Sequence, residues 1–310
     1  MKKLKVIFMG TPEIAVPFLE NLIDKVDVLL VVTKPDQKIG RKKILTASPI
    51  KQIALKHGIK VFQPSKVKND FDLIKKLQPD LIITFAFGEI LPVDVLNIPQ
   101  FGAINVHASL LPKYRGSAPI QRAILNGDKE TGVTLMYMNQ YMDEGDIIAS
   151  EKVSILENDN LQDLTSKLSI AAVELFNRCF DLIINNNIKR IKQNNDIATY
   201  APPIKRSDEL LDFNDSVINI YNKIRAFSPQ PLSYFKIDDL EIKVIKASYK
   251  KKEKAKPGCI TEIDKCHLGI DAKDGIIYLD KIKPFGKKEM DIVSFLNGIN
   301  KEKLKGKKVC

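Results

Sequence analysis

The sequence predicts an α/β protein: a Rossmann-like domain with a mostly parallel sheet, followed by a small β-barrel domain. Apolar strand patterns alternate with helix patterns through residues 1–186, which is typical of βαβ units. The composition changes near residue 187, where asparagine runs and Pro202-Pro203 interrupt regular structure. Short strand patterns separated by turns dominate after that point. We therefore expect a first domain over residues 1–186, a linker over 187–207 and a C-terminal domain over 208–310.

The elements of the first domain follow from hydrophobic periodicity and from residues that begin or end helices. Apolar runs rich in β-branched residues predict buried strands. Ser65 is suited to cap a helix, and Gly58 is suited to end one. The predicted strands are 4–9, 27–33, 60–62, 81–85, 103–107 and 132–138. The predicted helices are 12–24, 49–57, 65–77, 118–125 and 161 to about 185.

The C-terminal domain is predicted from one helix and several short strands. The helix pattern covers residues 216–226, and Asp274-Gly275 has the composition of a hairpin turn. The lysine-rich run 250–256 predicts an exposed loop. The predicted strands are 240–247, 258–263, 268–272 and 275–279.

The composition indicates a globular protein of the cytoplasm. Hydrophobic residues make up 44% of the chain and charged residues 28%. No apolar run reaches the roughly 20 residues that a membrane helix needs, and the N-terminal apolar run is too short for a secretory signal. The four cysteines form no C-x-x-C pair, and the spacing of Cys259, Cys266 and His267 does not fit a usual zinc site. We therefore expect no metal and no membrane partner.

The net charge of +11 is distributed unevenly along the chain. Residues 1–186 carry 23 basic and 21 acidic side chains, so the last 124 residues hold +9 of the total. Such an excess predicts a polyanionic partner such as nucleic acid. The alternative is a lysine-rich composition without a specific partner.

Asn105 and His107 are the first candidates for catalysis. They are two positions apart on a predicted strand, so both side chains leave the same face, near the edge where α/β sheets bind ligands. A hydrogen-bonded core histidine is the alternative interpretation. The phosphate-binding pattern G-x-G-x-x-G is missing after the first strand, which disfavours a dinucleotide oxidoreductase.

An asparagine amide can stabilise an oxyanion, and a histidine can exchange protons near neutral pH. The pair suits attack by an amine on a carbonyl carbon. Ser109 does not lie in a nucleophile elbow, so direct transfer is favoured over an acyl-enzyme. A carboxylate is needed to orient the histidine, and spacing alone leaves Asp143, Glu144 and Asp146 as candidates.

The Asn-x-His pair stands within a set of longer motifs. They read Phe8-x-Gly10-Thr11-Pro12, Phe87-Gly88-x-Ile90-Leu91-Pro92, Asn105-x-His107, Ser109-Leu110-Leu111-Pro112, Tyr114-Arg115-Gly116 and Ser117-Ala118-Pro119-Ile120, with the later Asp143. The set resembles the formyl-folate-dependent formyltransferases. The resemblance implies that Asn105, His107 and Asp143 are catalytic and that 10-formyltetrahydrofolate is the formyl donor. It implies a folate site formed by Phe87, Gly88, Ile90, Leu91, Ser109, Leu110, Leu111 and Pro112.

A loop in the first domain resembles the branch of that family whose acceptor is initiator methionyl-tRNA. It runs from Lys34-Pro35-Asp36 through Gly40-Arg41 to Ser48-Pro49-Ile50-Lys51. The resemblance implies that Arg41, Lys42 and Lys43 bind tRNA. It also implies that the C-terminal domain is an OB-like barrel and contacts the tRNA as well. Further C-terminal matches are Thr199-Tyr200-Ala201-Pro202, Ile224-Arg225-Ala226-Phe227-Ser228-Pro229, Lys256-Pro257-Gly258 and Phe295-Leu296-Asn297-Gly298.

The chain departs from the family pattern at several positions. The loop usually has glycine at position 42 and proline at 47, where this chain has Lys42 and Ala47. We expect a monomer, because no dimerisation stripe is evident. The rival predictions are a sugar-nucleotide amine formyltransferase and a non-catalytic RNA-binding protein.

Overall fold

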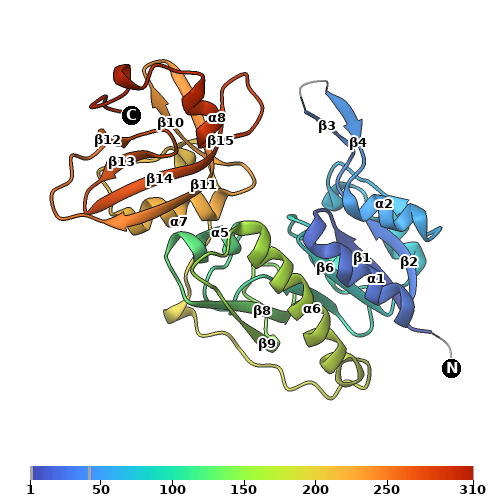
Figure 1. Cartoon of the computed structure of the whole chain (residues 1–310). Coiled ribbons are helices and arrows are strands. Elements are labelled where there is room, and N and C mark those ends of the chain that lie inside the picture. The colour runs from blue at the N-terminus through green and yellow to red at the C-terminus, as the bar shows by residue number, and fades with distance from the viewer. Residues whose placement is uncertain (1–2, 41–42, 310) are drawn as a thin grey trace. The chain divides into compact units, whose positions relative to one another are not determined.

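The structure is a computed structural model that describes residues 3–40 and 43–309 (Figure 1). The chain forms two compact units. The first contains Met1–Pro119, Glu130–Ser154 and Thr165–Pro202. The second contains Ile120–Lys129, Ile155–Leu164 and Pro203–Cys310.

The first unit is built on a sheet whose described strands run in the order β5-β2-β1-β6-β7-β8-β9. The strands from β5 to β7 pair in parallel, and β8 and β9 are antiparallel. This arrangement confirms the predicted Rossmann-like, mostly parallel sheet. The strands are β1 (Lys5–Gly10), β2 (Asp27–Val32), β5 (Val61–Phe62), β6 (Leu81–Phe85), β7 (Ala103–His107), β8 (Glu130–Tyr137) and β9 (Ile147–Ser154).

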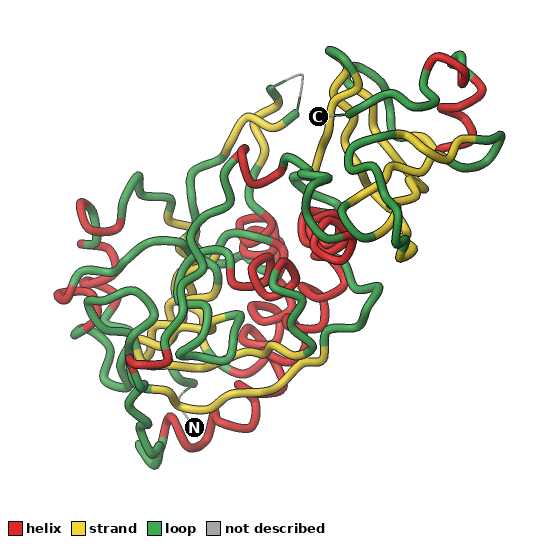
Figure 2. The backbone as a smooth tube through the Cα atoms, turned by 90° about the vertical axis from the view of Figure 1, so that its left-hand side faces the viewer, coloured by secondary structure: helices red, strands yellow, loops and turns green. Residues whose placement is uncertain are grey.

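Helices cover both faces of this sheet. On one face, Phe18 of α1 (Val16–Lys25) packs against Phe176 of α6 (Leu161–Ile184) and Phe85 of β6. The ring centroid of Phe18 lies 4.9 Å from that of Phe176 and 5.8 Å from that of Phe85. On the other face, Val67, Ile74 and Val95 join the buried cluster beneath β1, β2 and β6. These residues come from η2 (Val67–Asn69), α3 (Asp72–Leu77) and α4 (Val93–Leu96). The result is a three-layered α/β unit (Figure 2).

One helix prediction is wrong, and several elements of the first unit were not predicted. The helix expected over 65–77 is divided into η2 and α3, because Asp70 between them is extended at φ −153° and ψ 98°. The amide of Val67 donates to the Glu89 side chain at 3.1 Å. This hydrogen bond fixes η2 as a separate turn and not as the start of a continuous helix. The sequence prediction missed β9 and the small hairpin formed by β3 (Gln37–Ile39) and β4 (Ile44–Thr46). The helix α2 (Pro49–Lys56) begins as predicted, with Ser48 capping the Lys51 amide.

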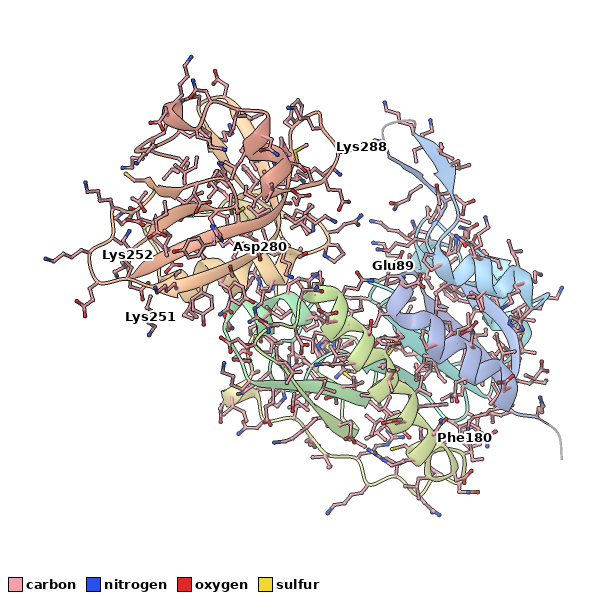
Figure 3. All side chains as sticks on the ribbon, in the orientation of Figure 1. Glu89, Phe180, Lys251, Lys252, Asp280 and Lys288 are labelled. Atoms are coloured by element: carbon pink, nitrogen blue, oxygen red, sulfur yellow. The ribbon has the colours of Figure 1, made fainter. Side chains whose placement is uncertain are left out.

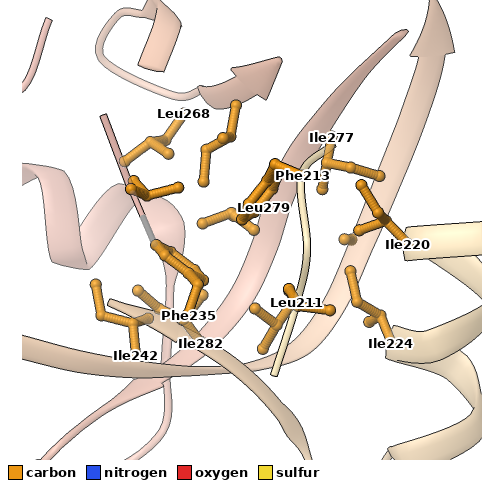
Figure 4. Close-up of a cluster of buried hydrophobic side chains, with 14 of the residues drawn as sticks. Leu211, Phe213, Ile220, Ile224, Phe235, Ile242, Leu268, Ile277, Leu279 and Ile282 are labelled. Atoms are coloured by element: carbon orange, nitrogen blue, oxygen red, sulfur yellow. The ribbon is translucent and has the colours of Figure 1, made fainter. Parts of the chain in front are cut away.

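The second unit is an antiparallel β-sheet with a helix packed on it, which confirms the predicted separate β-domain. The described strands run in the order β10-β11-β14-β13-β12, and β15 pairs with β14. Its core includes Phe213 and Phe235, whose rings meet edge to face at 5.8 Å (Figure 4). The strands are β10 (Ser233–Ile237), β11 (Leu240–Lys251), β12 (Ile260–Ile263), β13 (Leu268–Ala272), β14 (Gly275–Pro284) and β15 (Met290–Asp291). Its helices are α5 (Pro119–Leu125), α7 (Val217–Phe227) and α8 (Ile292–Asn297), and its short 3₁₀ helices are η4 (Arg206–Glu209) and η5 (Lys301–Lys303). The first unit has two further short 3₁₀ helices, η1 (Glu13–Ala15) and η3 (Asn195–Ile197).

Two details of the second unit differ from the sequence prediction. Lys250 and Lys251 belong to β11, where they pair with Ile276 and Gly275, instead of opening a loop (Figure 3 labels Lys251). The hairpin turn lies one residue earlier than predicted, because Ala272 pairs directly with Gly275. No helix in the described part of the chain is both long and apolar enough to span a membrane.

Candidate active site

Asn105 lies in β7, and its amide is fixed on both sides. The neighbouring strand β6 places Thr84 in register with it, and Oγ1 of Thr84 donates to Oδ1 of Asn105 at 2.7 Å. Since the amide oxygen faces Thr84, the amide nitrogen turns the other way and donates to Oδ1 of Asp143 at 3.2 Å. Ile104 and Val106 on the opposite face of the strand are buried. The amide of Asn105 is therefore held as a donor.

His107 is 6% exposed at the carboxyl end of the same strand. Its Nε2 lies 2.9 Å from the carbonyl oxygen of Tyr114, and its Nδ1 lies 3.5 Å from Oδ1 of Asp143. A carbonyl oxygen can only accept, so Nε2 carries a proton. The ring is thus held in one orientation with Nδ1 directed at an acid.

Asp143 is the residue that the structure selects from the three acidic candidates. It has φ +55°, and its Oδ2 accepts from the backbone amide of Gly116 at 2.8 Å. Glu144 turns instead to Arg115, with Nη1 and Oε1 3.3 Å apart. The structure therefore brings Asp143 together with Asn105 and His107.

Arg115 and Gln193 support this cluster, and sequence reasoning did not single them out. Nε and Nη2 of Arg115 donate to Oε1 of Gln193 at 3.1 and 2.9 Å. Nε2 of Gln193 donates to the carbonyl oxygens of Asp143 and Gly145, both at 2.8 Å. Arg115 stands within a motif, whereas Gln193 lies in a segment that the sequence indicated only as a linker.

The predicted folate-site residues divide into two groups. Ser109, Leu110, Leu111 and Pro112 directly follow β7, and Thr134 Oγ1 bridges them by donating to the Ser109 carbonyl at 2.7 Å and accepting from the Leu111 amide at 3.1 Å. In the second group, Phe87 and Leu91 are buried in the hydrophobic core. Gly88 and Ile90 instead line a hollow of about 610 Å³, together with Lys34, Pro35, Asp36, Gln37, Ser65, Lys66, Lys68 and Glu89. Ile90 is 57% exposed.

Of the three residues predicted to bind tRNA, the structure describes only Lys43, which directly precedes β4. Arg41 and Lys42 lie outside the described residues. Lys43 is exposed, has φ +49°, and its amide donates to the Gly40 carbonyl at 3.1 Å.

The base of this hairpin is fixed by a cluster of side chains. Nζ of Lys51 lies 2.7 Å from Oδ2 of Asp36 and 2.8 Å from Oε1 of Gln63. Nε2 of Gln63 donates in turn to Oδ1 of Asp36 and to the Lys34 carbonyl, both at 2.8 Å. Hydrogen bonds from Lys51 and then Gln63 lower the pKa of Asp36, so this carboxylate stays charged well into acid.

Cys259, Cys266 and His267 form no metal-binding group. Within residues 3–40 and 43–309, no three His, Cys, Asp or Glu side chains are placed to share an ion. His267 pairs with Asp264, whose pKa is lowered to about 2 by that hydrogen bond and by two backbone amides.

Comparison with known proteins matches both parts of the chain to one family. The family model for formyl transferase matches residues 2–179, and the model for the formyl transferase C-terminal domain matches residues 203–300. The methionyl-tRNA formyltransferase of Staphylococcus epidermidis (strain ATCC 35984) is 45% identical over 306 residues, covering 98% of each chain. That of Bacillus subtilis (strain 168) is 43% identical over 304 residues, covering 96% of each.

Solved structures share the fold at lower identity. HypX from Aquifex aeolicus has a TM-score of 0.69 at 16% identity, covering 98% of this chain and 50% of that one. An N-formyltransferase from Helicobacter canadensis has a TM-score of 0.62 at 24% identity, covering 89% of this chain and 98% of that one. With the family models and the close relatives, these likenesses lead to one assignment: the chain belongs to the formyl transferase family.

Proposed function

We propose that this chain transfers a formyl group from 10-formyltetrahydrofolate to the α-amino group of initiator methionyl-tRNA, the reaction that prepares this tRNA for translation initiation. The observation that carries the proposal is the convergence of Asn105, His107 and Asp143 at the carboxyl end of β7. A fixed amide donor, a protonated ring and a carboxylate suit direct attack of an amine on a formyl carbon. The near full-length relatives named methionyl-tRNA formyltransferase support the acceptor.

Each residue of the cluster has a distinct task in this proposal. The amine nitrogen bonds to the formyl carbon while negative charge develops on the formyl oxygen. Asn105 donates its second amide N–H to that oxygen. His107, whose ring nitrogens face the Tyr114 carbonyl and Asp143, supports the charge electrostatically. Asp143 holds the His107 ring and is the base for the proton that the amine loses. The bond from the formyl carbon to the folate nitrogen then breaks, and that nitrogen takes up a proton.

The chain offers suitable groups for the formyl-folate cosubstrate. We assign the turn Ser109-Leu110-Leu111-Pro112, which directly follows the catalytic strand, to the reacting end of the folate. The hollow beside Gly88 and Ile90 has an exposed apolar side chain and three lysines, Lys34, Lys66 and Lys68. Such a lining suits the aromatic and anionic parts of a folate. Phe87 and Leu91 support this site from the core.

For the tRNA we propose two binding regions. One is the hairpin loop with Arg41, Lys42 and Lys43, and the other is the basic OB-like region over residues 208–310. We propose that the catalytic domain spans 1–186, that residues 187–207 link it to the C-terminal region, and that the protein acts as a monomer in the cytoplasm. Phosphate contacts by lysine and arginine make such binding sensitive to salt.

The test is an incubation with 10-formyltetrahydrofolate and charged initiator methionyl-tRNA. The expected product is formyl-methionyl-tRNA. A parallel incubation offers an amino-sugar nucleotide, whose preferential formylation would assign the chain to a different acceptor class. The absence of product with every acceptor, combined with tight tRNA binding, would favour a non-catalytic RNA-binding protein.

A further inference from the structure

We propose that Arg115 and Gln193 are positioning residues for Asp143, so that the segment from Gln193 to Ala201 is a working part of the catalytic centre. The inference rests on the proposed function, since it assigns a role within the same site. All of these residues belong to the first unit.

The turn that carries Asp143 needs support from outside. Asp143 has a left-handed φ of +55°, which is unfavourable for a residue with a Cβ atom. The neighbouring apolar side chains do not anchor the turn, because Tyr141 is 58% exposed and Met142 is 54% exposed. Its position must therefore be set by hydrogen bonds.

Gln193 supplies two of those hydrogen bonds. Its amide nitrogen has two N–H groups, and they donate to the carbonyls of Asp143 and Gly145 on either side of the turn. Its amide oxygen accepts twice from Arg115. Because both ends of the amide are bonded, Gln193 has one orientation and fixes the backbone of the turn.

Arg115 connects this support to the catalytic side chains. It is 2% exposed, and its Nη2 also donates to Oδ1 of Asn195 at 2.7 Å. A buried guanidinium is costly unless its donors are bonded, so these partners hold it firmly. The residues on either side of Arg115 contact the catalytic groups directly: the Tyr114 carbonyl meets His107, and the Gly116 amide meets Asp143.

The chain segment beyond Gln193 completes the arrangement. The Arg115 amide donates to the Thr199 carbonyl at 2.9 Å, and the Ala201 amide donates to the Arg115 carbonyl at 2.7 Å. The Tyr114 amide donates to Oγ1 of Thr199 at 2.9 Å. Hydrogen bonds from Thr199 and Ala201 therefore fix the backbone around Arg115, while Gln193 fixes the turn that carries Asp143.

Removing the donors of Gln193 tests the inference. Gln193→Met has similar length and no charge but cannot donate. Gln193→Glu keeps acceptors for Arg115 but presents oxygen to the two carbonyls of the turn. For both variants we expect kcat for formyl transfer to fall about 100-fold, as for a misplaced catalytic group, with KM for tRNA and folate unchanged. Arg115→Lys keeps a positive charge near Glu144 but loses the forked geometry, and it should show the same pattern.

A second measurement does not depend on activity. The sequence has three histidines, and NMR of the imidazole rings in Gln193→Met should show a change at His107 but none at His57 or His267. Gln100→Met, the same change at an exposed glutamine of the first unit outside this segment, is the matched control and should leave both kcat and the His107 resonances unchanged. Thermal unfolding verifies that each variant is folded.

Three outcomes decide the matter. Wild-type kcat and an unchanged His107 signal in folded Gln193→Met would overturn the inference. Equal losses in kcat and in affinity for both substrates, without a change at His107, would show only a general structural role and would also overturn it. If the wild type forms no formyl-methionyl-tRNA, the proposed function fails, and the NMR comparison still decides whether Gln193 positions Asp143.

Discussion

Oδ1 of Asp143 lies 3.5 Å from Nδ1 of His107, while the other ring nitrogen is occupied by the carbonyl of Tyr114. The ring therefore has a fixed proton on Nε2 and a carboxylate beside Nδ1. Because both ring nitrogens face a partner, the ring has little freedom to turn. The proposed reaction depends on this arrangement.

Replacing Asp143 by asparagine tests that dependence. The amide keeps the shape and can still accept from Gly116, but it carries no charge to support His107 or to take a proton. We expect kcat to fall by a factor on the order of 10² to 10⁴. Single-turnover formyl transfer measures the loss, and tRNA binding should be unchanged. Turnover close to that of the wild type would contradict the role assigned to the carboxylate.

Asn105→Ala removes the amide donor from the strand. Loss of one oxyanion donor costs roughly 3–4 kcal/mol of transition-state stabilisation, and we expect it to appear in kcat with little change in KM. Thr84→Val is a graded comparison, because it removes only the hydroxyl that orients the Asn105 amide. Thr84→Val should lower kcat less than Asn105→Ala does, again with little change in KM. A larger effect on KM than on kcat in Asn105→Ala would point to a binding role instead.

Removing the positive charges of the hairpin loop should weaken tRNA binding. Alanine in place of Arg41, Lys42 and Lys43 should raise KM for tRNA and flatten its dependence on salt, since each phosphate contact contributes about 0.7 to 0.9 to the logarithmic slope. Asp36→Asn weakens the base of the same hairpin without removing a positive charge. It should raise KM while leaving the salt slope as in the wild type. An unchanged slope in the triple variant would argue against phosphate contacts by the loop.

Asp271 predicts how the stability of the second unit depends on pH. The carboxylate is 1% exposed, and burial alone would raise its pKa. Hydrogen bonds from Thr261, Lys252 and the Lys256 amide outweigh the effect of burial and lower the pKa below 3.8 (Figure 3 labels Lys252). A lower pKa in the folded state means that the ionised carboxylate stabilises the fold at neutral pH. That stabilisation is lost as pH falls through the folded-state pKa.

We therefore expect Asp271→Asn to lower the free energy of unfolding at pH 7 by about 2 kcal/mol. The difference from the wild type should begin to narrow below about pH 4, where the carboxylate of the unfolded chain takes up a proton, and should close as pH falls through the lower pKa of the folded state. Denaturant unfolding over a pH series measures it. Asp239→Asn, a change in an exposed turn, is the control. A difference that stays constant down to pH 2 would show that charge at Asp271 is not the cause.

The sequence predicted the parts of this molecule that follow from local pattern. Strand β7 was predicted with its correct bounds, because Ala103, Ile104 and Val106 form a buried run, and the same alternation placed Asn105 and His107 together. The helices expected over 49–57 and 216–226 are present as α2 (Pro49–Lys56) and α7 (Val217–Phe227). Such features depend on residues that are neighbours in the chain.

The features that were missed depend on contacts between distant segments. Spacing could not separate Asp143 from Glu144 and Asp146, because the choice is made by a left-handed turn and by the Gly116 amide. Nothing in the sequence around Gln193 indicates its role, because that role depends on hydrogen bonds to backbone carbonyls about fifty positions earlier in the chain. The helix expected over 65–77 failed for a similar reason, because the Glu89 side chain captures the amide of Val67.

The two units cannot be separated by cutting the chain once. Ile120–Lys129 and Ile155–Leu164 fold with Pro203–Cys310, so the chain passes between the units five times. Within the second unit, Arg225 donates to the carbonyls of Leu156 and Asp159 at 3.3 and 2.6 Å, and Tyr221 donates to Asn158 at 3.1 Å. A fragment that ends near residue 202 would lack the partners of these early segments. A chimaera that replaces the C-terminal part would therefore have to replace Ile120–Lys129 and Ile155–Leu164 as well.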